Sequence, residues 1–175
     1  SGTLTRASAY AGVPGLVEQT DSDLAPTGTW TTWSNTALSG GSYAHTSRAD
    51  GSMTIAFTGT SIDWVTVTNS NQGKARVFLD GVEQDDLVDL YSAGLQFQQT
   101  VWRSGPLADG AHTLTIAWSG QKNPASTGYY VGVDALLVSG IVNPLVTDQQ
   151  TDSDLAPTGT WTTRSNTARS AGSYA

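Results

Sequence analysis

The chain contains no cysteine, only two histidines and few charged residues, 13% of 175. Without cysteine there are no disulfide bonds, no thiolate nucleophiles and no thiolate metal sites. No apolar run approaches the roughly 20 residues that a membrane-spanning helix needs, so we expect no membrane insertion. The start at Ser1 has no signal-peptide pattern. We therefore expect a mature or excised fragment.

Positive charge is also scarce. The formal net charge is -7, the sequence pI is about 4.4, and no cluster of Lys or Arg interrupts this acidic balance. Such a charge distribution repels phosphate backbones and anionic lipid. We expect no nucleic-acid partner.

Groups suited to catalysis are few. His45 and His112 lie in no HExxH pattern, and no GxSxG elbow occurs. His112 follows a turn and precedes a strand pattern, which favours a structural role at a strand edge. Asp85, Asp86 and Asp89 alternate with apolar residues, which favours a solvated strand face over paired catalytic carboxylates. We expect that the protein is not an enzyme.

The chain repeats part of itself. Residues 20–44 read TDSDLAPTGTWTTWSNTALSGGSYA and residues 151–175 read TDSDLAPTGTWTTRSNTARSAGSYA, an offset of 151 − 20 = 131 with three differences in 25 positions. A period of this length is that of a whole domain in a tandem array. We therefore expect a linker or the end of a preceding repeat at 1–16, a module at 17–143, and a linker with the truncated start of a second copy at 144–175.

Two of the three differences replace an apolar residue by arginine. Arg164 stands at the position of Trp33, and Arg169 at that of Leu38. Burying an unpaired guanidinium costs several kcal/mol, on the order of 3 or more. The pattern predicts that positions 33 and 38 both face solvent, which makes Trp33 an exposed tryptophan.

Short alternating runs rich in β-branched and aromatic residues fill the middle of the chain, and Asp80-Gly81 is a hairpin signal. About eight or nine short strands with frequent turn residues predict an all-β fold, a two-sheet antiparallel jelly-roll β-sandwich. Trp64 and Trp118 fit core positions in it, while Trp30 and Trp102 stay undecided. The runs are 53–57, 62–67, 75–79, 87–91, 95–102, 114–118 and 131–137.

The segment 144–175 carries few large apolar groups for its length. Ordering each residue costs roughly 1 to 2 kcal/mol, so this segment cannot fold alone. It is either disordered or adds strands to another surface, for example by replacing residues 20–44 of a neighbouring copy.

A series of motifs in this order resembles the galactose-binding-domain-like β-sandwich modules of secreted and surface proteins. The resemblance covers about residues 17–140 and implies a jelly roll related to several families of carbohydrate-binding modules. The motifs are Gly28-Thr29-Trp30, Gly40-Gly41-Ser42-Tyr43, Phe57-Thr58-Gly59-Thr60-Ser61-Ile62-Asp63-Trp64, Gly73-Lys74-Ala75-Arg76-Val77-Phe78-Leu79-Asp80-Gly81, Gly110-Ala111-His112-Thr113-Leu114 and Val133-Asp134-Ala135.

The same resemblance implies a structural calcium ion as a possible cofactor. Related modules hold calcium between an acidic residue near the first strand and an Asp in the last, and Glu18 and Asp134 occupy comparable places. Calcium takes six to eight oxygen ligands, so backbone carbonyls and Asp21 or Asp23 would have to contribute. Gln149 stands opposite Glu18 in the second copy, and the alternative is that Asp134 caps backbone groups in a core strand.

A sugar site needs an exposed aromatic ring with amide or charged side chains at its rim. Trp33 is the candidate ring. Polar residues in two turns could converge on it. The predicted ligand-binding residues are Trp33, Asn69, Asn71, Gln72, Lys122, Asn123 and Tyr129.

These patterns favour a non-catalytic carbohydrate-binding module in a secreted or cell-surface protein, whose partner is a carbohydrate or cell-surface glycan. Tandem copies would amplify weak binding per module. The alternative is a structural adhesion or filament module that assembles with neighbouring copies of itself by strand exchange through 144–175.

Overall fold

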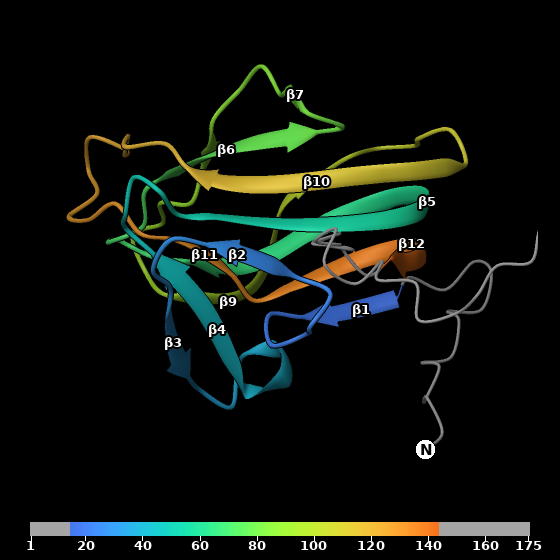
Figure 1. Cartoon of the computed structure of the whole chain (residues 1–175). Coiled ribbons are helices and arrows are strands. Elements are labelled where there is room, and N and C mark those ends of the chain that lie inside the picture. The colour runs from blue at the N-terminus through green and yellow to red at the C-terminus, as the bar shows by residue number, and fades with distance from the viewer. Residues whose placement is uncertain (1–14, 144–175) are drawn as a thin grey trace, which may run out of the picture. The chain divides into compact units, whose positions relative to one another are not determined.

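The computed structural model describes residues 15–143, which form the β-sandwich in Figure 1. The expectations for a linker before this range, and for disorder or strand donation by the tandem segment, lie outside the described residues. The first strand, β1, begins at Gly15, two residues before the expected start of the module at 17.

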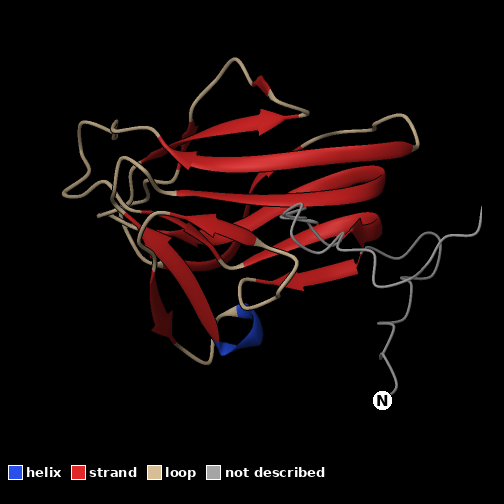
Figure 2. Cartoon of the chain, in the orientation of Figure 1, coloured by secondary structure: helices blue, strands red, loops and turns tan. Residues whose placement is uncertain are grey.

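Two antiparallel sheets make up the module, and strands dominate its structure (Figure 2). The larger sheet has the order β1-β12-β5-β10-β6-β7, with β2 and β9 also paired to β5 and β8 to β6; the smaller has the order β11-β4-β3. This confirms the all-β, two-sheet prediction. The bounds are β1 Gly15–Glu18, β2 Ala25–Thr27, β3 Thr31–Ser34, the 3-10 helix η1 Ser39–Gly41, β4 Ser42–Thr46, β5 Ser52–Thr68, β6 Lys74–Leu79, β7 Val82–Glu83, β8 Val88–Asp89, β9 Gln96–Arg103, β10 Gly110–Trp118, β11 Val131–Val133 and β12 Ala135–Asn143.

The long strand β5 organises the larger sheet. It joins the two runs predicted at 53–57 and 62–67 into one 17-residue strand. Its first half pairs with β10 and its second half with β9, while β12 follows its other edge. β12 has a bulge after Ser139, where its backbone lies very close to Gly59 of β5. A Cβ at Gly59 would collide with the Ser139 carbonyl. Glycine is therefore required at this crossing.

The core lies between the sheets. Trp64, Phe57 and Ile62 are fully buried, as the alternation along β5 predicts. Trp64 is thus a core residue as expected, whereas Trp118 is partly buried and packs against the core, as do Trp30 and Trp102.

The predicted hairpin at Asp80-Gly81 is present. Leu79 pairs with Val82, and both turn residues have positive φ, 52° for Asp80 and 76° for Gly81. This is the conformation of a two-residue type I′ turn.

The expectation that position 38 faces solvent is wrong. Leu38 is 4% exposed and belongs to a small cluster with Tyr43, Val67 and the partly buried Phe97. Leu38 directly precedes η1, in the connection between β3 and β4. Trp33, on β3 itself, is 38% exposed, as predicted.

Candidate functional site

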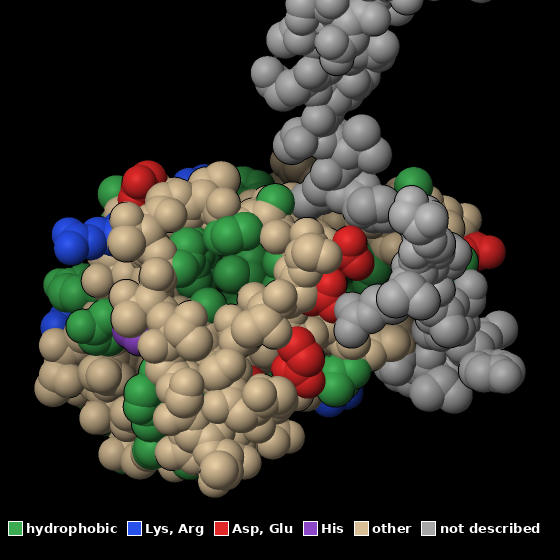
Figure 3. Space-filling view, turned by 60° about the horizontal axis from the view of Figure 1, so that its bottom comes forward, with side chains coloured by type: hydrophobic (Ala, Val, Ile, Leu, Met, Phe, Trp, Pro, Cys, Tyr) green, Lys and Arg blue, Asp and Glu red, His purple; other side chains and the backbone are tan. Residues whose placement is uncertain are grey.

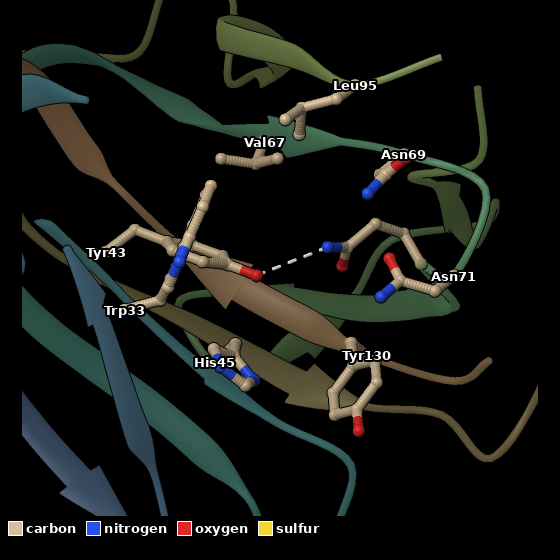
Figure 4. A pocket seen from close by; sticks show the side chains of 9 residues that line it. Trp33, Tyr43, His45, Val67, Asn69, Asn71, Leu95 and Tyr130 are labelled. Carbon is tan, nitrogen blue, oxygen red and sulfur yellow. Dashed lines mark hydrogen bonds between the residues drawn. The ribbon is translucent and has the colours of Figure 1, made fainter. Parts of the chain in front are cut away.

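A pocket of about 310 Å³ opens between the smaller sheet and the turn that follows β5. Figure 4 shows the rings of Trp33 and Tyr43 on one side and the amides of Asn69 and Asn71 on the other. The residues that line it are Trp33, Tyr43, His45, Val67, Asn69, Asn71, Gln72, Leu95 and Tyr130.

Strand pairing builds the aromatic wall. Trp33 of β3 pairs with Tyr43 of β4, and His45 lies two residues further along β4, so the three side chains share one face. The Trp33 ring meets Tyr43 edge-on at 5.9 Å and stacks on Phe97 at 6.0 Å. One face of Trp33 is therefore supported by the protein, which fixes its orientation at the mouth of the pocket.

The polar wall belongs to the turn between β5 and β6. Asn69 Oδ1 accepts a hydrogen bond from the Ser70 amide, and Gln72 Nε2 donates to Tyr43 Oη at 3.3 Å. Ser126 fixes this turn from the next loop, because its hydroxyl donates to the carbonyls of Ser70 and Gln72. Hydrogen bonds thus hold the backbone of the turn and two of its amide side chains, those of Asn69 and Gln72.

Three buried polar atoms of residues that line the pocket have no hydrogen-bond partner within residues 15–143: His45 Nδ1, Asn71 Oδ1 and Gln72 Oε1. An unpaired buried polar atom costs roughly 1 to 3 kcal/mol. All three can accept a hydrogen bond, so the pocket suits a ligand that carries hydroxyl or amide hydrogens.

Burial sets the protonation states in this wall. Desolvation lowers the pKa of His45, and its ring lies 5.2 Å from Tyr43 and 5.1 Å from Tyr130. Desolvation also raises the pKa of Tyr43. Both side chains are therefore neutral at pH 7, and no charged side chain is among those that line the pocket.

The structure brings four of the seven predicted ligand-binding residues together here: Trp33, Asn69, Asn71 and Gln72. The other three lie outside the lining and stabilise the loop before β11. Lys122 Nζ donates to the Ser126 carbonyl and lies 4.8 Å from the Tyr129 ring, and Asn123 donates to Asp89.

Sequence reasoning missed five lining residues. Tyr43 and His45 could have been found from their spacing of two, which places them on one face of a strand beside Trp33. Tyr130 enters through an isolated bridge to Gln72, which no local pattern signals. The missed residues are Tyr43, His45, Val67, Leu95 and Tyr130.

A second polar cluster lies at the start of the module. Ser39 contacts both predicted acidic residues: its hydroxyl donates to Glu18 Oε1 at 2.7 Å, and its amide donates to Asp134 Oδ2 at 3.3 Å. Glu18 Oε2 and Asp134 Oδ1 are buried without a partner. We call Glu18 and Asp134 the carboxylate pair.

The surroundings of the carboxylate pair disfavour the ionised form of Asp134. Asp134 is 0% exposed, and desolvation, with a contribution from Glu18, raises its pKa to about 6. Two carboxylates with unpartnered oxygens and a nearby hydroxyl are ligands that calcium accepts. Within residues 15–143, no group of three or more His, Cys, Asp or Glu side chains could hold a metal ion, so further ligands would be carbonyls or water. All of these donors are oxygen atoms, which is the ligand type that calcium takes.

The remaining predicted candidates have structural surroundings. His112 on β10 contacts the Asp80 carboxylate at 2.8 Å and the Ala108 carbonyl at 2.9 Å. Because both acceptors favour the charged ring, the Ala108 and Asp80 contacts raise the pKa of His112. Asp85, Asp86 and Asp89 are exposed, as a solvated face requires.

Figure 3 turns the lower side of Figure 1 toward the viewer. On this face hydrophobic side chains gather in a hollow, and Asp and Glu side chains lie beside it. Within the described residues, no helix is long and apolar enough to cross a bilayer.

Two curated proteins of Flavonifractor plautii are similar to this chain, and no protein-family model matches it. An A type blood N-acetyl-alpha-D-galactosamine deacetylase is 33% identical over 100 residues, which is 57% of this chain and 13% of the relative. An A type blood alpha-D-galactosamine galactosaminidase is 41% identical over 64 residues, 37% of this chain and 6% of the relative. The chain thus spans only a small part of two much longer enzymes.

Solved structures show the same fold. A Paenibacillus xanthan lyase matches 79% of this chain with 14% of its own, at 19% identity and a TM-score of 0.58. A family 35 carbohydrate-binding module from Clostridium thermocellum matches 70% of this chain with 96% of its own, at 16% identity and a TM-score of 0.46. The xanthan lyase match shows that this chain shares its β-sandwich fold with a part of that enzyme.

Proposed function

We propose that this module is a non-catalytic carbohydrate-binding unit of a secreted or cell-surface protein, and that it binds a glycan in the pocket between Trp33 and Asn71. The observation that carries the proposal is the pairing of an aromatic wall with three unpartnered acceptors in one open cavity. Sugars present apolar C–H faces to aromatic rings and hydroxyls to amides, so both walls have a use.

A non-catalytic role is supported by what lines the pocket. Neither Asp nor Glu is among its lining residues, so no carboxylate pair can act there as general acid and base. His45, the lining histidine, contacts two tyrosine rings and has no carboxylate partner within the described residues to orient it.

The ligand class follows from the two Flavonifractor relatives. Their names describe activity on A type blood N-acetylgalactosamine and galactosamine. We therefore propose glycans that end in galactose or N-acetylgalactosamine as ligands. The near-copy of residues 20–44 at 151–175 supports presentation in tandem, where effective concentration raises the avidity of weak sites.

We propose in addition that calcium binds the carboxylate pair as a structural ion. The supporting observation is that each carboxylate leaves one buried oxygen unpartnered. Glu18 and Asp134 would hold the ion, which would supply the positive charge that this enclosed site lacks. The bound state would keep η1 against β1 through Ser39.

Assembly by strand exchange has less support. A segment 151–175 that replaced residues 20–44 would place Arg169 at the position of Leu38, which is 4% exposed. It would also place Ala171 at the position of Gly40, where φ is +56° and a Cβ would lie 2.9 Å from Glu18 Oε2. Both changes oppose the exchange.

The test of the binding proposal is a glycan array followed by calorimetry on the full chain, with Trp33→Ala compared to Tyr129→Ala. Both residues are exposed aromatics, but only Trp33 lines the pocket. We expect Trp33→Ala to weaken binding about tenfold or more and Tyr129→Ala to change it less than about threefold. Absence of any glycan ligand, or unchanged binding by Trp33→Ala with an unchanged melting temperature, would refute the proposal.

A further inference from the structure

The pocket differs from the rest of this acidic chain in having no charge of either sign among its lining residues. Its polar atoms are those of neutral amides, tyrosine hydroxyls and the imidazole of His45. These groups match hydroxyls well, because each can donate to or accept from an uncharged partner.

Two lysines, Lys122 and Lys74, interact with other groups of the protein. Lys122 Nζ donates to the Ser126 carbonyl and packs over the Tyr129 ring. Lys74 lies 3.7 Å from the Asp89 carboxylate. Neither cation lines the pocket, so none of the described lining residues offers a guanidinium or ammonium group to an anionic ligand.

A carboxylate that entered the pocket would lose hydration without gaining a counter-ion, and it would face the unpartnered acceptors of His45, Asn71 and Gln72. Rotation of the Asn71 or Gln72 amide could turn a donor toward it but adds no charge. The net charge of -7 opposes an anion further.

We propose that this pocket selects uncharged saccharides and rejects uronic acids and other anionic sugars. The inference rests on the proposed carbohydrate-binding function and adds the charge class of the ligand. The discrimination comes from an absent counter-ion and unpaired acceptors, which is how a site rejects a competitor of nearly the same shape.

The test measures affinity of the full chain, by calorimetry, for three matched pairs: galactose with galacturonic acid, glucose with glucuronic acid, and mannose with mannuronic acid. Members of a pair differ only at C6. For the pair whose neutral sugar binds, we expect the uronic acid to bind at least about tenfold more weakly. Its methyl ester, which removes the charge and keeps the carbonyl, should recover binding to within about threefold of the neutral sugar.

A variant makes the counter-ion argument testable in the protein. Leu95 lines the pocket and is 45% exposed, so a longer polar side chain can replace it without disturbing the core. Relative to Leu95→Gln, Leu95→Lys should strengthen uronic acid binding about fivefold or more, because a cation at a partly exposed site contributes modest attraction. Leu95→Gln is the uncharged control and should not improve uronic acid binding.

The outcomes separate the two proposals. If a uronic acid binds as tightly as its neutral partner, and Trp33→Ala abolishes both, the pocket binds sugar but the charge selectivity is wrong. An equal effect of Leu95→Lys and Leu95→Gln on the uronic acid also overturns it. If no sugar of either kind binds and the glycan array also finds no ligand, the carbohydrate-binding function itself fails.

Discussion

All five buried side-chain atoms that lack a hydrogen-bond partner in the described residues fall in two regions, the pocket and the carboxylate pair. The pocket is open and neutral, and its unpartnered atoms belong to amides and an imidazole. The pair is enclosed and charged, and its unpartnered atoms belong to carboxylates. Both regions therefore contain buried polar atoms without a partner, but the partners that would satisfy them differ. Hydroxyls suit the pocket, and a proton or a cation suits the carboxylate pair.

One stretch of chain serves both regions. From β3 to β4 it supplies Trp33 and Tyr43 to the pocket, Leu38 to the cluster beneath it, and Ser39 to the carboxylate pair. The second copy changes both regions. Arg164 and Arg169 replace Trp33 and Leu38, Ala171 replaces Gly40, and Gln149 stands opposite Glu18. The differences between copies thus fall on the residues that distinguish the two regions.

The largest expected effect comes from placing arginine in turn at Leu38 and Trp33, the two positions where the second copy has arginine. Leu38→Arg buries a guanidinium beside Tyr43 and Val67 and should lower the free energy of unfolding by on the order of 3 to 5 kcal/mol. Trp33→Arg, at an exposed position, should cost less than about 1 kcal/mol. Denaturant titrations of both variants measure the two losses in the free energy of unfolding. Equal losses would show that Leu38 does not lie in a packed cluster.

The second-largest expected effect is on stability, through Asp134 of the carboxylate pair. The pKa of Asp134 is raised to about 6, above its usual 3.8, so folding favours its protonated form. This stabilisation is complete below pH 3.8 and is lost as the pH rises through about 6. With a chelator present, Asp134→Asn should therefore be more stable than the parent at pH 7.5, by about 2 to 3 kcal/mol. Matched melting curves at pH 4 and pH 7.5 test this, and a difference independent of pH would contradict it.

Calcium binding should also distinguish the carboxylate pair from the pocket. Added calcium should raise the melting temperature of the parent chain at pH 7.5, because an ion bound only by the folded state stabilises it. Asp134→Asn and Glu18→Gln should lose most of this rise, whereas Asn71→Ala in the pocket should keep it. A rise that survives in Asp134→Asn would place the ion elsewhere.

In the pocket, pH should act on binding through His45. Desolvation holds the pKa of His45 below its usual value, so its Nδ1 remains an acceptor from pH 8 to pH 6.5. Protonation at lower pH converts this acceptor to a donor and adds charge between Tyr43 and Tyr130. Neutral-sugar affinity should fall about threefold or more as His45 becomes protonated, with a midpoint below pH 6.5, and His45→Gln should flatten the profile. A fall in affinity that persists unchanged in His45→Gln would remove His45 from the binding wall.

The smallest effect lies outside both regions. The Ala108 and Asp80 contacts raise the pKa of His112, so its contribution is present below pH 6.5 and is lost as the pH rises through its higher folded value. His112→Gln should cost less than about 1 kcal/mol at pH 5.5, and less again at pH 8.5, because the pair is near the surface. Sugar binding should not change; a change would mean that the two regions are not independent of the rest of the module.

The sequence by itself determined the fold class and part of the pocket. Alternation along 53–67 places Phe57 and Trp64 in the core, and Asp80-Gly81 specifies its hairpin, because both signals are local. The exposure of Trp33 followed from its exchange for Arg164. The same logic gave the wrong result for Leu38, because the second copy is a different sequence, and an arginine there says nothing about packing in this one.

Only the tertiary structure decided which residues meet. Tyr130 reaches the pocket by bridging to Gln72, 58 positions earlier (130 − 72), and Lys122 and Asn123 turn away because Ser126 and Asp89 hold them. Periodicity assigns a residue to a face of its own strand. Whether two turns distant in sequence converge depends on strand order and register, which are set by the packing of the whole core.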